Sequence, residues 1–130
     1  MRVGVDLLSV RRFAKVATHP KYRAVLFTRA ELAQAEGLGE ERCVERLAGR
    51  FCVKEATCKV LGRGFGQGLR WRDIEVLNDD WGAPRVTLSG GARELAEAAG
   101  LGEVAVTLTH QADLAVAVAV AVAIAGPSAG

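Results

Sequence analysis

The order of apolar patterns along the chain predicts a single α+β domain, with strands near both ends and one long helix between them. Three observations predict this class. Residues 3–8 form a short apolar run interrupted by Asp6, the longest helical period covers residues 40–61, and strand-like segments follow residue 73. The chain has 130 residues, which is enough for one hydrophobic core, whereas two domains would each be too small.

Two short helices are expected between the first strand and the long helix. The first has apolar residues at helical spacing, Val10, Phe13, Ala14 and Ala17. It stops at His19, because the residue before a proline is pushed out of the helical region. The second begins at Thr28, where Thr28 and Glu31 match the capping-box pattern, and Gly37 is expected to close it.

The second half of the chain is expected to hold four strands and a short helix. The long helix ends at Gly62, and strands at residues 73–77 and 85–88 flank a turn at residues 78–82. Ser89 is a candidate N-cap for a helix that ends near Gly100. Strands at residues 104–109 and 114–125 follow. In the last strand alanines alternate with large residues, which therefore share one face: Val116, Val118, Val120, Val122 and Ile124.

Composition excludes several classes of protein. Hydrophobic residues make up 50% of the chain and charged residues 25%, as in an ordinary globular protein. We therefore expect one domain at residues 1–125 and a flexible tail at residues 126–130. The net charge of +2 and the aromatic content of 5% are too low to predict a nucleic-acid partner. Residues 114–125 are too few to cross a bilayer as a helix, so no membrane partner is expected.

The three cysteines indicate a reducing compartment. Cys43, Cys52 and Cys58 form no C-x-x-C pair, and an odd number fits neither a disulfide framework nor a zinc site. No signal peptide pattern opens the chain, because the first apolar run is short and contains Asp6. A cytoplasmic location is therefore expected.

Basic side chains are concentrated near the N-terminus. The first 29 residues contain seven of them and a single acid. On the first helix, Arg11, Arg12 and Lys15 lie opposite the apolar residues. Such a row suits docking of an acidic partner, and a solvated basic helix face is an equal alternative.

Four polar residues are candidates for chemistry: Asp6, Glu55, Lys59 and His110. Asp6 interrupts an apolar strand, which suggests a metal ligand, a helix N-cap or an ion pair. Glu55 falls on the helical arc of Leu47 and Phe51, with Lys59 one turn later. This pair either lines a cleft or forms a surface i,i+4 pair. His110 follows a strand directly, and a structural or simply exposed histidine is the alternative.

The types of these four residues suit one chemistry. Two carboxylates suit magnesium, which keeps waters and takes further ligands from substrate phosphates. A lysine and a histidine suit those phosphates.

Several sequence blocks occur in the order of one family, and the chain resembles the holo-acyl-carrier-protein synthases through them. They cover nearly all of residues 3–124. The blocks are Gly4-Val5-Asp6, Phe27 to Glu31, Leu47 to Ala56, Lys59, the glycine-rich residues 62–68, Trp71 to Val76, Gly82-Ala83-Pro84 and Thr107-Leu108-Thr109-His110. The segment around Gly49-Arg50-Phe51 and Lys54-Glu55-Ala56 is the most specific of them.

The resemblance implies a fold, an assembly and a reaction. The expected fold is an antiparallel sheet packed with a long helix, assembled as a homotrimer that binds coenzyme A at each subunit interface. The expected reaction transfers 4′-phosphopantetheine from coenzyme A to a serine of an apo-acyl carrier protein and releases adenosine 3′,5′-bisphosphate. A module that binds coenzyme A or the carrier protein without catalysis is the alternative. Whether the carrier serves fatty-acid or polyketide synthesis, and which acyl groups on coenzyme A are tolerated, is left open.

The resemblance also implies roles for individual residues. Asp6 and Glu55 would bind magnesium, while Glu55, Lys59 and His110 would act in catalysis, the last two on the coenzyme A phosphates. The proton acceptor for the serine is either Glu55 or a metal-bound water. Other expected coenzyme A contacts are Arg50, Gly62, Gly64, Gly66, Pro84 and Thr109, some of them from a neighbouring subunit. The carrier protein would dock on Arg11, Arg12 and Lys15.

Two departures from the family pattern concern the site. Gln111 stands after the histidine, where many members have an acid. Cys52, Val53 and Cys58 replace small residues near the proposed metal ligand Glu55.

Overall fold

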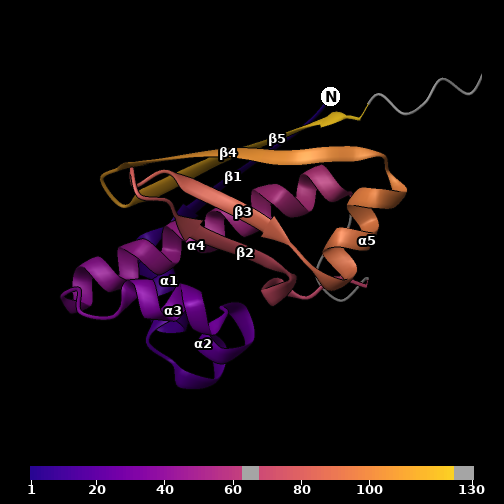
Figure 1. Ribbon diagram of the computed structural model, residues 1–130. Coiled ribbons are helices and arrows are strands. Elements are labelled where there is room, and N and C mark those ends of the chain that lie inside the picture. Colours follow the sequence, from indigo (N-terminus) through magenta and orange to yellow (C-terminus); the bar gives the residue numbers. More distant parts are fainter. Residues whose placement is uncertain (63–67, 125–130) are drawn as a thin grey trace, which may run out of the picture.

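A computed structural model gives the fold of residues 1–62 and 68–124 (Figure 1). Its helices and strands confirm the predicted α+β class. The predicted contacts Gly64 and Gly66 and the predicted tail lie outside the described residues. The elements in chain order are β1 (Arg2–Ser9), α1 (Val10–Ala17), α2 (Pro20–Leu26), α3 (Arg29–Ala35), α4 (Glu40–Leu61), the 3₁₀ helix η1 (Trp71–Asp73), β2 (Ile74–Asn78), β3 (Pro84–Leu88), α5 (Gly90–Ala98), β4 (Leu101–Gln111) and β5 (Leu114–Ala123).

The strands form two antiparallel sheets. The first has the order β1-β5-β4, so the two ends of the chain pair with each other and Asp6 lies opposite Ala117. The second is the hairpin of β2 and β3. Helix α4 runs along the inner face of the first sheet, with β2 beside it (Figure 1).

Small residues bring α4 close to the first sheet. The four alanines of β5 that face the helix are almost completely buried, Ala115, Ala117, Ala119 and Ala121. Gly4 of β1 lies so close that a Cβ atom on it would be 2.1 Å from the carbonyl oxygen of Ala56. The long helix therefore lies directly against the strand that carries Asp6.

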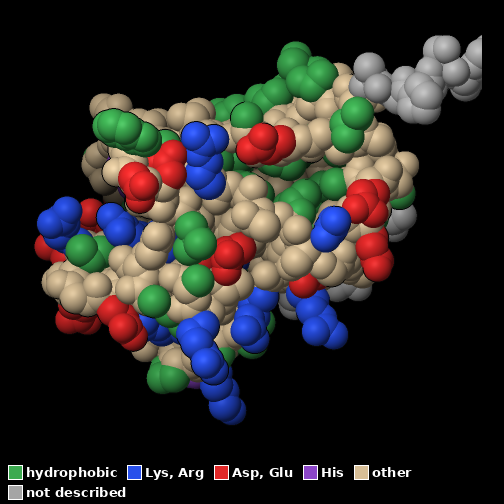
Figure 2. All heavy atoms as spheres, viewed as in Figure 1, with side chains coloured by type: hydrophobic (Ala, Val, Ile, Leu, Met, Phe, Trp, Pro, Cys, Tyr) green, Lys and Arg blue, Asp and Glu red, His purple; other side chains and the backbone are tan. Residues whose placement is uncertain are grey.

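The large residues of β5 face away from α4. The predicted separation of valines and alanines onto two faces is thus confirmed, with the valines outside. Odd-numbered residues of β1 extend the same apolar face, and Val3, Val5 and Leu7 are all about half exposed or more. In Figure 2 hydrophobic side chains follow the upper edge of the molecule, where this sheet lies.

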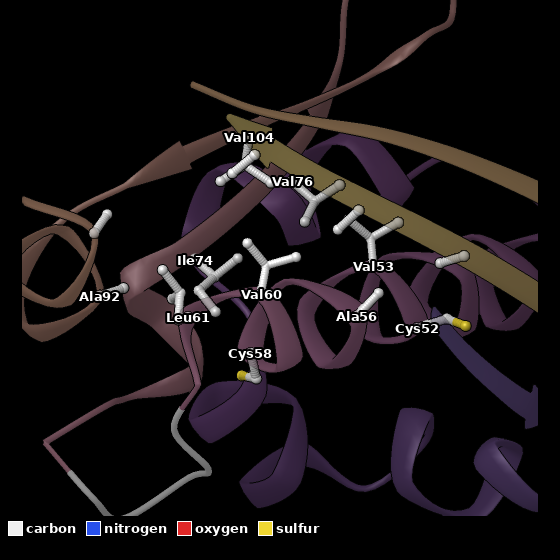
Figure 3. Packing of buried hydrophobic residues seen from close by; sticks show 14 of the residues in the cluster. Cys52, Val53, Ala56, Cys58, Val60, Leu61, Ile74, Val76, Ala92 and Val104 are labelled. Carbon is white, nitrogen blue, oxygen red and sulfur yellow. The ribbon is translucent and has the colours of Figure 1, made fainter. Parts of the chain in front are cut away.

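The opposite side of α4 packs on the remaining elements. Val53 and Val60 of α4 meet Ile74 and Val76 of β2 in the main hydrophobic core (Figure 3). A smaller cluster joins α1, α3 and the first half of α4 through Phe13, Phe27, Ala35, Leu47 and Ala48. Because α4 is covered on several sides, most of its residues from Leu47 to Leu61 are buried.

The structure differs from the sequence prediction in three places. Helix α2 was not predicted, because Pro20 was taken only as a stop, whereas proline also fits the first position of a helix. Strand β4 is longer than predicted and reaches Gln111. Phe51, Glu55 and Lys59 were placed on an apolar arc of α4, but they are its less buried row, since the surrounding elements cover the other sides. Among the described helices, none is long and apolar enough to cross a membrane.

Candidate functional site

Asp6 is buried where β1 faces α4, and part of its carboxylate is unsatisfied. Lys59 Nζ lies 3.3 Å from Asp6 Oδ1 and donates to the carbonyl oxygen of Val5 at 2.6 Å. Within residues 1–62 and 68–124, Asp6 Oδ2 is buried and accepts no hydrogen bond. Buried carboxylate oxygens normally have a partner, so this oxygen can accept either a ligand or a proton donor from a neighbouring side chain.

Glu55 lies one turn before Lys59 and interacts with Asp6. The pKa of Glu55 is raised to about 7, chiefly by burial and then by the charge of Asp6, while Lys59 opposes the shift. A hydrogen bond to Asp6 adds to the effect, since the protonated Glu55 can donate to the Asp6 carboxylate. Two neighbouring carboxylates resist being ionised together unless a cation lies between them. The pair is thus suited to a divalent cation.

The donor set fits magnesium. Among the described residues no three His, Cys, Asp or Glu side chains gather around one point. Magnesium is commonly held by one or two carboxylates and completes its shell with water and substrate phosphates. Two carboxylates are therefore an adequate set of protein donors for this cation.

His110 lies apart from the carboxylate pair. In the sheet register Asp6 shares a row with Ala117 and Leu108, whereas His110 lies two rows further along with Ala115, on the strand two positions from β1. Its ring lies against Gly49 of α4, where a Cβ atom would be 3.3 Å from His110 Cε1. Gly49 precedes Glu55 by six residues, or about 9 Å along the helix axis. One chain therefore brings together Asp6, Glu55 and Lys59 and leaves His110 at a distance.

His110 faces a groove of about 720 Å³ between three elements. Helix α1 forms one wall, the first turns of α4 form another, and the turn between β4 and β5 closes the end. The charged residues that line it are Arg11, Glu40, Glu41, Glu45 and Asp113.

Arg50 points into the interior of the chain. Only 2% of its surface is exposed, Nη1 donates to the carbonyl oxygen of Glu31 at 2.7 Å, and Nη2 contacts Oε1 of Gln34. Burial lowers the pKa of Arg50, and Glu31 opposes this shift. Its predicted contact with coenzyme A remains a prediction.

The other predicted coenzyme A contacts lie on the periphery. Gly62 ends α4 in the left-handed conformation with φ 79°, next to the undescribed part of the glycine-rich segment. Pro84 begins β3, and Thr109 is exposed on the outer face of β4.

The predicted docking residues, Arg11, Arg12 and Lys15, are all exposed on α1. Beside this helix lies a hollow of about 290 Å³ lined entirely by apolar and aromatic side chains. Its residues come from α1, α2 and α4: Phe13, Val16, Tyr22, Val25, Leu26 and Phe51.

Sequence reasoning missed a buried ion pair on the opposite side of α4. Lys54 Nζ lies 2.9 Å from Glu31 Oε1 and donates to the carbonyl oxygens of Trp71 and Ile74. Glu31 also accepts from the backbone N–H groups of Thr28 and Val76. The capping box at Thr28 was predicted, but no local pattern pointed from Glu31 to Lys54.

Comparison with known proteins places these features in a family. Residues 2–119 match the 4′-phosphopantetheinyl transferase superfamily. The chain is 40% identical to the holo-[acyl-carrier-protein] synthase of Moorella thermoacetica over 85% of this chain and 84% of that protein.

Solved structures show the same fold. The holo-[acyl-carrier-protein] synthase of Helicobacter pylori in complex with coenzyme A is 26% identical, with a TM-score of 0.79 over 92% of this chain and 99% of that one. The synthase of Bacillus anthracis in complex with CoA (3′,5′-ADP) is 32% identical, with a TM-score of 0.79 over 95% and 96% of the two chains.

Proposed function

The chain belongs to the holo-[acyl-carrier-protein] synthases of the 4′-phosphopantetheinyl transferase superfamily, and on this basis we propose how its residues carry out the reaction. The enzyme transfers 4′-phosphopantetheine from coenzyme A to a serine of apo-acyl carrier protein. Adenosine 3′,5′-bisphosphate is the leaving product.

The observation that carries the proposal is the Asp6–Glu55 pair. One oxygen of Asp6 is buried without a partner among the described residues, and the pKa of Glu55 is raised by burial and, to a smaller extent, by the charge of Asp6. In our proposal Asp6 and Glu55 would hold Mg²⁺, and the cation would supply positive charge to offset negative charge on the reacting phosphates.

The remaining work is positioning and charge stabilisation by the chain itself. The Lys59 ammonium has three donors, of which Asp6 and Val5 accept two, and we assign the third to a coenzyme A phosphate. His110 donates to a phosphate oxygen from its place above Gly49. Glu55, or water held beside it, accepts the proton of the attacking serine. Arg50, the glycines from Gly62 to Gly66, Pro84 and Thr109 complete the coenzyme A site in this proposal.

A homotrimer would complete this site. His110 is remote from Asp6 within one chain, so a neighbouring subunit is needed to supply its imidazole. The outer sheet face offers an apolar contact surface, with Val3, Val5 and Leu7 of β1 beside the valines of β5. Light scattering is expected to give the mass of three chains, and Val118→Glu is expected to give monomers without activity. A monomeric, fully active wild-type protein would refute the shared site.

The carrier protein is proposed to dock on α1. Arg11, Arg12 and Lys15 present positive charge, and the neighbouring apolar hollow accepts a hydrophobic side chain of an acidic helix. Arg12→Glu should weaken carrier binding and reduce its dependence on salt, with little change in coenzyme A affinity. An equal loss of affinity for the carrier protein and for coenzyme A would contradict this docking site.

The test of the function itself is mass spectrometry of an apo-acyl carrier protein incubated with this protein, coenzyme A and Mg²⁺. A gain of one phosphopantetheine group on the serine is expected. Binding of coenzyme A without any gain in mass would favour the non-catalytic binding module. Carrier proteins from fatty-acid and polyketide synthesis, offered in parallel, would identify the substrate. The free thiols of Cys43, Cys52 and Cys58 are in keeping with a cytoplasmic reaction.

A further inference from the structure

The turn between β4 and β5 has an unusual backbone conformation. Gln111 pairs with Leu114, so Ala112 and Asp113 alone form the turn. Ala112 has φ 53°, and no other non-glycine residue in the described ranges has a positive φ. Residues with side chains rarely adopt this region, and they keep it only where surrounding contacts hold them there.

Those contacts come from the start of helix α1. The Asp113 carboxylate accepts from the backbone N–H of Arg11 at 2.8 Å through Oδ1 and from the Ser9 hydroxyl through Oδ2. The backbone N–H of Val10 donates to the carbonyl oxygen of Asp113 at 2.8 Å. Ser9 in turn caps α1 by accepting from the N–H of Arg12. Asp113 thus occupies three donors of a helix that belongs to the other end of the chain.

The bonds to Asp113 also affect its protonation. Hydrogen bonds from Ser9 and from the N–H of Arg11 hold the pKa of Asp113 below its usual value. The carboxylate is therefore ionised at neutral pH, where it is the stronger acceptor.

The turn and the helix carry different parts of the proposed machinery. His110 lies three residues before Asp113, and its ring rests on Gly49. Helix α1 presents the proposed carrier-docking residues Arg11 and Arg12. The two elements line the same groove, so a change in one would alter the placement of the other.

We propose that Asp113 is a positioning residue, which links the β4–β5 turn to the first turn of α1 through its hydrogen bonds. Because this turn follows His110, the link sets the distance between the imidazole and the docked carrier protein. This inference rests on the proposed function, since it uses the roles assigned there to His110 and α1. It adds a residue to which neither the family pattern nor the site geometry had assigned a part.

Kinetics of Asp113→Ala test the proposal. We expect a loss of roughly tenfold in kcat and a higher KM for the carrier protein, because both elements lose a common support. In a His110→Ala background the same change should lower kcat by less than about threefold. No imidazole is then left to position, and the effects of residues that act together are not additive. Asp113→Asn keeps one acceptor oxygen and should lie between Ala and wild type. Ala96→Gly in α5, a buried site on another element, is the stability control and should leave kcat and KM unchanged.

Two results would overturn the proposal. One is a tenfold loss in both backgrounds, and the other is a lower Tm with unchanged kinetics. A second readout does not need activity: Asp113→Ala should shift the NMR signal of the His110 ring and speed hydrogen exchange at the Arg11 N–H. Unchanged signals would refute the link even in an inactive enzyme. Absence of transfer by the wild-type protein would refute the proposed function instead, and the NMR result would still decide the role of Asp113.

Discussion

Helix α4 carries two lysine–carboxylate pairs that face different environments. Lys54 and Glu31 are both completely buried, and their charged groups are hydrogen-bonded to each other and to backbone groups. The side chains of Lys59 and Asp6 are 55% and 10% exposed, and Asp6 keeps a buried oxygen without a partner in the described structure. The hydrogen-bonding capacity of the Lys54–Glu31 pair is fully used, whereas the Lys59–Asp6 pair has an oxygen that can still accept.

This difference separates structure from function on one helix. A saturated ion pair ties α3, α4 and β2 together and has nothing to offer a substrate. The Lys59–Asp6 pair still has an unpartnered oxygen, and it lies beside Glu55, whose pKa is raised. This arrangement is expected where a cation and phosphates are to be bound. We therefore expect the adjacent residues Lys54 and Glu55 to have different roles, Lys54 in stability and Glu55 in the proposed site.

Lys54→Met should have the largest effect on stability. It leaves the Glu31 carboxylate buried without a cation, and breaking such a pair typically costs about 3–5 kcal/mol. Urea denaturation would measure the loss. The double variant Glu31→Gln/Lys54→Met should recover part of it, because no unpaired charge is then buried. A loss below about 1 kcal/mol would mean that the buried pair is not a structural support.

Glu55→Gln should have the largest effect on activity. It keeps the shape of the side chain but removes the negative charge that would bind the metal. We therefore expect the transfer rate to fall on the order of a hundredfold at limiting Mg²⁺ and to be partly restored at high Mg²⁺. Stability should hold or rise, since the repulsion between two carboxylates is removed. Rate against Mg²⁺ concentration would be compared with Glu94→Gln on α5, an exposed control. An unchanged magnesium dependence would remove Glu55 from the metal site.

Lys59→Met should separate the two pairs most clearly. Because Lys59 is largely exposed, the expected loss of stability is below about 1 kcal/mol, in contrast to Lys54. The KM for coenzyme A should nevertheless rise about tenfold, the usual size for one charged hydrogen bond. Thermal unfolding and steady-state kinetics on the same samples provide the comparison, which fails if stability falls as far as in Lys54→Met.

The smallest expected effect is a pH dependence of stability in the metal-free protein. The pKa of Glu55 is about 7 in the folded chain, above its usual value of 4.5, so the folded state holds this proton more tightly. The contribution is complete below pH 4.5 and is lost as pH rises through 7. In EDTA, Tm of wild type relative to Glu55→Gln should fall across this window. A difference that rises with pH would contradict the raised pKa.

Local patterns predicted the elements well. The capping box formed as expected, with Thr28 N donating to Glu31 and Glu31 N donating to Thr28. Helix α4 has the predicted bounds, Glu40 and Leu61. Its C-terminal end could be predicted because Gly62 directly follows the last helical residue. Such signals depend on residues a few positions apart, which a sequence displays directly.

Partners distant in the chain could not be predicted in this way. Asp6 and Lys59 are 53 positions apart, and Glu31 and Lys54 are 23 apart. The position of Asp6 inside an apolar run suggested that it needed a partner but did not indicate which lysine would be nearest. The separation of His110 from the carboxylates likewise depends on strand register, which the sequence leaves undetermined.

The pairing of β1 with β5 also determines when the site can form during synthesis. Asp6 is synthesised more than a hundred residues before β5, and in the described part of the chain the strand that pairs with β1 is β5, Leu114–Ala123. Contacts between the two ends of a chain form late and slow the folding of a domain. A nascent chain can therefore form its local helices early, yet it cannot hold Asp6 in place until residues 114–123 have been made. A product that stops before residue 114 should lack the proposed metal site.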